Sequence, residues 1–276
     1  FILRGVDYAF RVLVDGKPVF EQEGMFRPVD LDVTALLRSR SVLAVEVAPA
    51  PKYPHAHRPK AQASRSCKPA VSYGWDFHPR LVPLGIWDEA YLEVRPSVTV
   101  GPAAVTYELS AALDRADVVA RVPVTGDVDT LVWQLRDPRG SVVAETRASC
   151  VGASVVELHA QVDHPALWWP NGEGEQALHV SVLEARDVGG RMLAESRQRL
   201  GFRRVRLVMN GHAWDEPSTF PKGRSTPPIT VEINGRRLFA RGSNWVCPDI
   251  FPGTVGRDRL RDQLVLARDA HFNLLR

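Results

Sequence analysis

The chain is short of the features that define several protein classes. Its three cysteines, Cys67, Cys150 and Cys247, lie far apart and form no CxxC pair. This spacing argues against a structural zinc site and against a disulfide framework. We therefore expect each cysteine to be a small buried or half-buried side chain, a pattern that favours a cytoplasmic location over a secreted one.

Long apolar runs and an excess of one charge are also missing. No apolar run approaches the ~20 residues that a membrane-spanning helix needs, so no membrane partner is expected. The 35 basic and 32 acidic residues are spread along the whole length and give a formal charge of only +3. No basic face stands out, and we expect no nucleic-acid partner.

What the sequence does have is short, alternating strand patterns. Residues 8–22 place Phe10, Val12 and Val14 on one face before Asp15-Gly16, a pair that predicts a hairpin turn. Residues 41–49 and 90–96 repeat the alternation and end at prolines, which cannot donate to a strand ladder. Short regular strands continue from about 97 to 207, with turn signals such as 137–140 and 189–190. This second set predicts an antiparallel β-sandwich of immunoglobulin size.

The pattern changes near the end of the chain. After the hairpin signal Asn234-Gly235, the stretch 256–270 carries Leu260, Leu264 and Ala267 at helical spacing, and "HFNLLR" then reads as a short buried strand. Strand, loop, helix and strand form one βαβ unit, which requires a parallel sheet. Because the chain stops inside this apolar run and lacks an initiator Met, we expect both ends to be cuts through a longer polypeptide.

Two stretches carry residue types suited to sugar recognition. In "SYGWDFHPRLVPLGIWDEAYLEV", Trp75 and Trp87 are each followed by an aspartate, within a long irregular loop, 50–88. The apolar face of a pyranose packs on an indole while a carboxylate accepts from its hydroxyl groups. An anchoring role for both indoles is the competing interpretation. A second pair, Trp168 and Trp169, is expected to pin a loop by packing against a neighbouring domain.

The βαβ unit supplies further candidates. Loops at the carboxyl ends of parallel strands are where barrels place active sites, which points to Asn244, Trp245 and Asp249 in "ARGSNWVCPDIFPG". Arg276 lies at the carboxyl end of the next strand. From spacing alone it is only a strand-end arginine.

Taken in this order, the stretches resemble glycoside hydrolase family 2, most closely its β-mannosidase branch. "SYGWDFHPRLVPLGIW", "LWWPNGEGEQALHVSVL", "VEINGRRLFARGSNWVCPDIFPG" and "AHFNLLR" match family motifs colinearly. The resemblance implies a mainly β fold class. It comprises a partial jelly-roll sugar-binding domain (1–96), an immunoglobulin-like β-sandwich (97–208), a linker (209–228) and the first βαβ unit of an incomplete (β/α)8 TIM barrel (229–276).

The resemblance also implies an activity. Family members of this branch are retaining exo-acting hydrolases that remove β-linked sugars, mannose by first preference, so the expected partner is a β-linked oligosaccharide or glycoside. Two glutamates about 5–5.5 Å apart perform such chemistry, with no metal and no cofactor. The family's acid/base follows an asparagine, but none of the five asparagines here precedes a glutamate. Both glutamates are therefore expected beyond Arg276, and the chain alone is expected to be inactive.

Supporting residues carry over by position. Trp75 and Asp76 match the loop that contacts the sugar being cleaved, and Arg276 matches the arginine directed toward the nucleophile, whose pKa a nearby cation would lower. Asn244, Trp245 and Asp249 match the first barrel loop as substrate-binding residues, where the family's "NWIPAD" becomes "NWVCPD". Trp168 and Trp169 stay structural.

Two alternatives stay open. The chain could have another family 2 specificity, such as that of a β-galactosidase, a β-glucuronidase or an exo-glucosaminidase. It could instead be a non-catalytic, lectin-like carbohydrate-binding protein. The βαβ unit favours the enzyme, because a lectin has no use for the beginning of a barrel.

Overall fold

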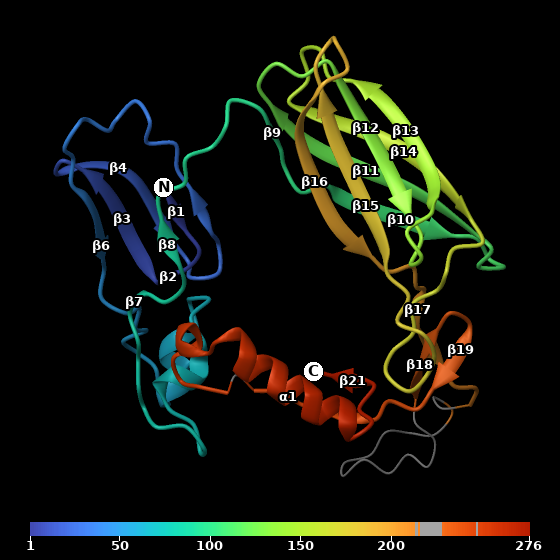
Figure 1. Cartoon of the computed structure of the whole chain (residues 1–276). Helices are drawn as coiled ribbons and strands as arrows, with labels where there is room; N and C mark the ends of the chain where they lie inside the picture. The colour runs from blue at the N-terminus through green and yellow to red at the C-terminus, as the bar shows by residue number, and fades with distance from the viewer. Residues whose placement is uncertain (213–214, 216–227, 247) are drawn as a thin grey trace. The chain divides into compact units, whose positions relative to one another are not determined.

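A computed structural model describes residues 1–212, 215, 228–246 and 248–276 of the chain. The described residues are mainly β (Figure 1) and include a single α-helix. Its residues form two compact units, one of residues 1–94 and 246–263, called unit 1, and one of residues 95–245 and 264–276, called unit 2. Cys247 and most of the expected linker 209–228 lie outside the described residues.

Unit 1 is built from short antiparallel strands. One sheet has the order β5-β1-β8, a second the order β4-β3-β6, and β2 pairs with β7. The strands are β1 (Ile2–Leu3), β2 (Val6–Asp7), β3 (Ala9–Val14), β4 (Lys17–Glu23), β5 (Val29–Asp30), β6 (Leu43–Val47), β7 (Gly85–Ile86) and β8 (Ala90–Tyr91). The 3-10 helices η1 (Pro59–Ala63) and η2 (Ala70–Tyr73) lie in the long loop, and η3 (Pro252–Thr254) follows near the end of the chain.

The predicted hairpin joins β3 to β4. Asp15 and Gly16 have φ values of 48° and 79°, the left-handed geometry that a tight hairpin turn requires. Phe10, Val12 and Val14 are buried while Arg11 between them is exposed, so the period-2 pattern is confirmed. Phe10 and Val12 form the core of unit 1 with residues of β1, β2 and β5.

The strand predicted at 90–96 is shorter than expected. β8 contains only Ala90 and Tyr91, which pair with the two residues of β1. Because β1 offers no further partner, the ladder stops there, and Val94 is 97% exposed.

Unit 2 contains the predicted β-sandwich. Its sheets have the orders β10-β11-β14, with β9 beside β11, and β13-β12-β15-β16. The strands are β9 (Thr99–Val100), β10 (Ala104–Leu109), β11 (Arg115–Thr125), β12 (Thr130–Arg136), β13 (Val142–Ser149), β14 (Val155–Asp163), β15 (His179–Arg186) and β16 (Met192–Leu200). The predicted turns at 137–140 and 189–190 connect β12 to β13 and β15 to β16.

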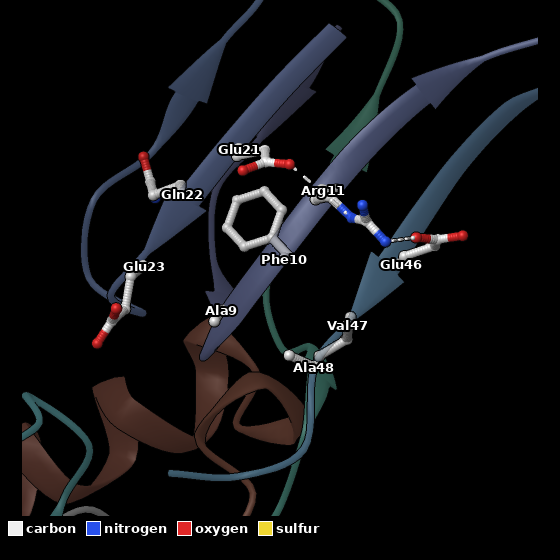
Figure 2. Close-up of a pocket in the computed structure, with 9 residues that line it drawn as sticks. All are labelled: Ala9, Phe10, Arg11, Glu21, Gln22, Glu23, Glu46, Val47 and Ala48. Carbon is white, nitrogen blue, oxygen red and sulfur yellow. Dashed lines mark hydrogen bonds and ion pairs between the residues drawn. The ribbon is translucent and has the colours of Figure 1, made fainter. Parts of the chain in front are cut away.

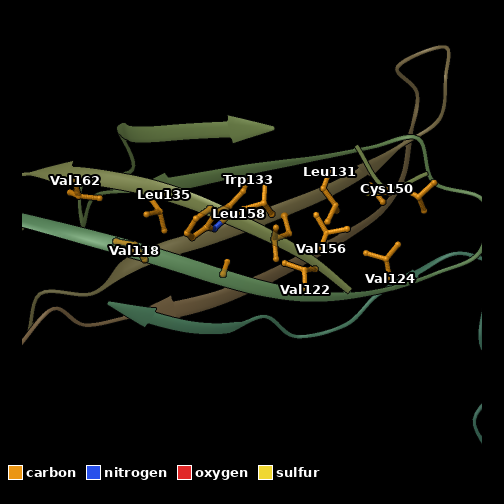
Figure 3. Packing of buried hydrophobic residues seen from close by; sticks show 14 of the residues in the cluster. Val118, Val122, Val124, Leu131, Trp133, Leu135, Cys150, Val156, Leu158 and Val162 are labelled. Atoms are coloured by element: carbon orange, nitrogen blue, oxygen red, sulfur yellow. The ribbon is translucent and has the colours of Figure 1, made fainter. Parts of the chain in front are cut away.

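Side chains from both sheets form the hydrophobic core of the sandwich, which is a single cluster. Figure 3 shows Val118, Val122 and Leu158 of one sheet facing Leu131 and Trp133 of the other. The Trp133 indole is buried and donates to the Ser181 hydroxyl at 2.9 Å, so its one polar group keeps a partner away from water. This arrangement confirms the immunoglobulin-like sandwich.

A second, smaller sheet follows the sandwich in unit 2. Strand β17 (Val205–Met209) pairs with β18 (Ile229–Ile233), which forms a hairpin with β19 (Arg236–Leu238) through Asn234-Gly235 as predicted. The φ values of 50° and 79° at this turn again fit a tight hairpin.

The βαβ unit is present. Strand β20 (Gly242–Ser243) pairs in parallel with β21 (Leu274–Leu275), and α1 (Arg257–Asp269) connects them (Figure 1). The helix agrees with the predicted range 256–270. Leu274 and Leu275 are 40% and 39% exposed, so the expectation that this strand is buried was wrong. Among the described residues β21 pairs only with β20, and no further layer covers it.

The cysteine expectation is confirmed at one position and wrong at another. Cys150 is buried in the sandwich core. Cys67 is exposed and lies in the irregular loop, next in sequence to the buried Lys68. No helix among the described residues is both long and apolar enough to cross a membrane.

Candidate functional site

A tight turn in unit 1 presents Trp75 and Asp76. Helix η2 ends at Tyr73, and the next residue, Gly74, has a φ of 118°, a conformation that side-chain-bearing residues rarely adopt. The Trp75 amide then donates to the His78 carbonyl at 2.9 Å, and the His78 amide returns a bond to Trp75 at 3.3 Å. Asp76 lies at the tip of this turn, where its only described hydrogen bond is from the Phe77 amide at 3.1 Å. Its other carboxylate oxygen is free to accept from a ligand.

The indole of Trp75 is 43% exposed, but one of its faces is occupied. The Lys60 ammonium lies 2.7 Å from the ring centroid, and the Phe77 ring is tilted against it at 6.2 Å. A cation over an indole face is held by the ring quadrupole. Lys60 was not predicted, because an irregular loop follows no spacing rule that would pair it with Trp75.

Trp87, the second tryptophan of this stretch, has an anchoring role. Its indole donates to the Met25 carbonyl at 3.1 Å and meets the Phe26 ring edge-on at 6.3 Å. A Cβ at Gly5 would collide with the ring, so glycine is required there. The two indoles thus differ, since Trp87 fixes the loop and Trp75 faces outward.

A buried ion pair supports the same loop. The Lys68 ammonium donates to the Asp7 carboxylate and to the Pro83 carbonyl at 2.7 Å, and the Lys68 side chain is fully buried. Beside this pair Tyr73 is also buried. Its burial raises the pKa of Tyr73, and the Asp7 carboxylate adds to that rise. Asp7 and Lys68 are 61 residues apart, and no sequence pattern links them.

Asp249, also in unit 1, is engaged within its own loop. Its carboxylate accepts from the Phe251 amide at 3.1 Å and from the Arg259 guanidinium at 3.2 Å. Both bonds lower the pKa of Asp249, and the bond from the Phe251 amide has the larger effect. The Arg259 guanidinium also donates to the Pro248 carbonyl at 3.0 Å, so Asp249 ties this loop to the first turn of α1.

In unit 2 the parallel pair brings Asn244 and Arg276 together. They follow β20 and β21, which pair in parallel, so that the carboxyl ends of the two strands are neighbours. The Arg276 guanidinium donates to the Asn244 side-chain oxygen at 3.0 Å, and the Trp245 amide donates to the Arg276 carbonyl at 2.7 Å. Trp245 is 41% exposed. Three of the six predicted residues thus meet at one end of the pair.

A polar cluster at the other end of this strand pair was not predicted. Glu173, in the loop after Trp169, accepts from Arg236 and Arg241 at 3.1 Å each and from Asn273 at 3.3 Å. Arg241 and Asn273 precede β20 and β21 directly. Glu173 is separated by 63 to 100 residues from these partners, and only the fold reveals their proximity.

Trp168 and Trp169 are used structurally, as expected. The Arg203 guanidinium lies 4.6 Å from the Trp168 ring, and that of Arg236 lies 4.3 Å from the Trp169 ring. The side chain of Asn234 donates to the Trp168 carbonyl at 3.0 Å. Both indoles therefore pack within unit 2.

The β4-β3-β6 sheet of unit 1 forms a groove of about 610 Å³ that contains none of the candidate residues. Figure 2 shows Arg11 on its surface between Glu21 and Glu46. The Arg11 guanidinium is 2.8 Å from Glu46 and 4.0 Å from Glu21. All three side chains are about half exposed or more, which is the normal charged outer face of a sheet.

The described residues contain no group of three or more His, Cys, Asp or Glu side chains arranged to hold a metal ion. The candidates divide between the two units. Trp75, Asp76 and Asp249 belong to unit 1, whereas Asn244, Trp245 and Arg276 belong to unit 2.

Comparison with known proteins gives these residues a family context. Residues 1–88 match the family model described as the galactose-binding domain-like domain of glycosyl hydrolase 2. Residues 98–203 match the model of glycosyl hydrolases family 2. The two matches together cover most of the chain.

Relatives with curated names are similar over the whole chain. A β-mannosidase of Rattus norvegicus is 26% identical over 305 residues that include 100% of this chain and 33% of the relative. A β-mannosidase B of Thermothelomyces thermophilus is 24% identical and covers 99% of this chain and 32% of its own length. The chain thus spans about a third of the length of the curated relatives that it matches.

Solved structures show the same fold. The β-D-mannosidase of Dictyoglomus thermophilum superposes with a TM-score of 0.76 at 22% identity, over 99% of this chain and 34% of that one. An exo-chitosanase of Amycolatopsis orientalis superposes with a TM-score of 0.66 at 21% identity, over 99% and 30%. With both family models matched in order and relatives similar along its full length, the chain belongs to glycoside hydrolase family 2.

Proposed function

We propose that this chain is the sugar-recognising, amino-terminal part of a retaining exo-β-glycosidase that hydrolyses terminal β-mannosides. In this proposal both catalytic glutamates lie outside the 276 residues. The curated relatives are about three times as long as the matched region, and no asparagine here precedes a glutamate. The chain would contribute binding and orientation, and the remainder of the enzyme would contribute the reacting carboxylates.

The observation that carries the proposal is the Asn244–Arg276 pair at the carboxyl ends of two parallel strands. That edge is where a (β/α)8 barrel places its catalytic groups. A guanidinium held there favours the ionised form of a nearby carboxylate and lowers its pKa, which keeps a nucleophile ready to attack. Asn244 would hold the guanidinium in place by accepting one of its hydrogen bonds.

Trp75 and Asp76 are the proposed contacts to the sugar. The exposed indole offers an apolar face to a pyranose ring, and the free oxygen of Asp76 accepts from a hydroxyl group. Asp249 is proposed to act indirectly, because its carboxylate is already bonded to Phe251 and Arg259. Trp245, exposed beside Asn244, is proposed as a further apolar contact.

A retaining mechanism has two steps, and each of the two glutamates has a role in them. One glutamate would attack the anomeric carbon and form a glycosyl-enzyme, while the other protonates the departing oxygen and later activates water. None of these steps uses a residue of this chain as the acid, base or nucleophile. Loss of Trp75, Asp76 or Arg276 should therefore reduce the rate without abolishing the mechanism.

Expression of the complete open reading frame and assay with 4-nitrophenyl glycosides tests the proposal. The β-mannoside should have the highest kcat/KM among β-mannoside, β-galactoside, β-glucuronide and β-glucosaminide, and the 276-residue chain alone should be inactive on all four. Preference for another sugar would reassign the specificity. Binding without hydrolysis by the complete product would favour the lectin-like alternative.

A further inference from the structure

The long loop of unit 1 carries an unusual concentration of positive charge. Residues 50–88 contain six lysines or arginines and two acids, Asp76 and Asp88, against 35 and 32 in the whole chain. The rest of the chain therefore has 29 basic and 30 acidic residues and is close to neutral. The loop that contains Trp75 thus carries a formal charge of +4, more than the +3 of the whole chain.

Most of these cations are not neutralised. Lys68 is paired with Asp7 in the interior. The other five have no carboxylate within 4.0 Å among the residues that the structure describes; they are Lys52, Arg58, Lys60, Arg65 and Arg80. The sandwich strands of unit 2 differ, since Arg121, Arg147 and Arg197 each lie within 3 Å of a glutamate oxygen.

Two of these five cations belong to residues close to Trp75 or to Gly74, which precedes it. Lys60 lies over the Trp75 ring, and the Cβ of its neighbour Pro59 lies 3.7 Å from the position that a Cβ on Gly74 would take. The Cβ of Arg80 lies 3.8 Å from the position that a Cβ on Gly74 would take, and its guanidinium lies 5.8 Å from the Tyr73 ring. Aromatic rings orient cations while leaving their charge uncompensated, so both remain available to an anion.

We propose that Lys60 and Arg80 form an anion subsite beside Trp75, and that the preferred ligand is a β-glycoside whose stacked sugar carries a sulfate or phosphate group. The inference rests on the proposed function, because it takes Trp75 as the sugar contact. The Lys60 ammonium leaves the indole face as the sugar stacks and pairs with the anionic substituent. A free lysine on the stacking face is a poor arrangement for a neutral sugar and a favourable one for an anionic sugar.

Nucleic acid is the less suitable anion. Single-strand binding uses a basic groove that follows several nucleotides, whereas the excess of positive charge here belongs to one loop and the remainder of the chain is close to neutral. Each exposed cation about 4 Å from a single anion in water strengthens binding by roughly fivefold. Allowing for the lost freedom of both side chains, we expect the two together to give about tenfold.

NMR titration of the 276-residue chain with methyl β-mannoside and methyl β-mannoside 6-sulfate measures the effect. The reporter is the Trp75 indole N–H, assigned by Trp75→Phe. The sulfated sugar should bind about tenfold more tightly at low salt, and the difference should vanish at about 1 M NaCl, where the Debye length is roughly 3 Å. Lys60→Gln/Arg80→Gln should remove the difference, while Lys17→Gln, an exposed lysine of the same unit, should preserve it.

Equal affinity for the two sugars would overturn the inference and leave the proposed function standing. An equal loss with the Lys17→Gln control would also overturn it, because the effect would then be one of net charge. If sodium sulfate binds as tightly as the sulfated sugar and methyl β-mannoside gives no shift, sugar recognition at Trp75 fails, and with it both this inference and the role that the proposed function gives to Trp75. Tighter binding of a single-stranded oligonucleotide would assign the loop to nucleic acid instead.

Discussion

Glu173 is expected to control the order of the strand pair that carries Asn244 and Arg276. Its carboxylate, 17% exposed, accepts from Arg236 and Arg241 at 3.1 Å each. It also accepts from Asn273 at 3.3 Å. Glu173→Ala removes all three contacts and leaves two guanidinium groups without this partner.

The magnitude follows from the exposure of the partners. Arg236 and Arg241 have side chains 49% and 44% exposed, so each ion pair is screened by solvent and contributes about 0.5 kcal/mol. The bond from Asn273 to a charged, largely buried acceptor adds about 1 kcal/mol. The local opening free energy of the strand pair should fall by about 2 kcal/mol in total.

Hydrogen exchange measures this change directly. The amide of Asn273 donates to the Arg241 carbonyl at 2.9 Å across the pair. A loss of about 2 kcal/mol corresponds to roughly thirtyfold faster exchange of this amide. Glu195→Ala is the matched control, since Glu195 is also a partly exposed glutamate, 30% exposed, paired with an arginine in a strand of the sandwich. Unchanged exchange at Asn273 in Glu173→Ala, or an equal change in the control, would refute the reasoning.

Three further predictions concern the sugar contact, the buried ion pair and the sandwich. Asp76→Ala in the complete enzyme should lower kcat/KM for an aryl β-mannoside by about 10- to 100-fold with an unchanged circular dichroism spectrum, because one hydrogen bond to a charged acceptor is lost; an unchanged rate would remove Asp76 from the site. Lys68→Met should destabilise unit 1 by about 3–5 kcal/mol in urea unfolding, because the Asp7 carboxylate is left buried and uncompensated. The double variant Asp7→Asn/Lys68→Met should recover most of this lost stability. Equal instability of the two variants would contradict the ion-pair explanation. Burial lowers the pKa of His179 below its ordinary 6.5. The neutral imidazole therefore stabilises the sandwich above that pH, and this contribution is lost as the pH falls through the folded-state pKa. Between about pH 7 and about pH 5 the Tm of unit 2 should fall less in His179→Gln than in the wild type, and parallel Tm profiles of the two proteins would disprove this.

Local signals in the sequence predicted much of the fold. The pairs Asp15-Gly16 and Asn234-Gly235 adopt the left-handed turns expected of them, because such turns depend on two residues alone. The helix at 256–270 was predicted from spacing and is observed as Arg257–Asp269. One prediction that failed concerned a strand whose length depends on its pairing partner. The strand predicted at 90–96 ends after Tyr91 since β1 has only two residues to pair with.

The candidate site likewise contains residues whose proximity the sequence predicts and contacts that it does not predict. Asn244 and Arg276 were predicted separately and are hydrogen-bonded, because parallel strands necessarily bring their carboxyl ends together. Contacts made by irregular segments could not be predicted. Lys60 reaches Trp75 through a loop without periodicity, and Glu173 meets Asn273 across 100 residues.

The charge around Trp75 is an intermediate case. A count over residues 50–88 shows the local excess of lysine and arginine from the sequence alone. The sequence does not say which of these cations are already compensated. Only the fold distinguishes Lys68, paired in the interior, from Lys60, which lies over the Trp75 ring, and Arg80, which lies over the Tyr73 ring.

The most direct measurement of the central claim is the stereochemistry of the first product. The complete open reading frame is expressed, and its reaction with 4-nitrophenyl β-mannoside is followed by proton NMR from the first minutes. A retaining enzyme passes through a glycosyl-enzyme and releases the β-anomer first, with the α-anomer growing only by later mutarotation. The account predicts β-mannose first; release of α-mannose first, or no hydrolysis at all, would contradict it.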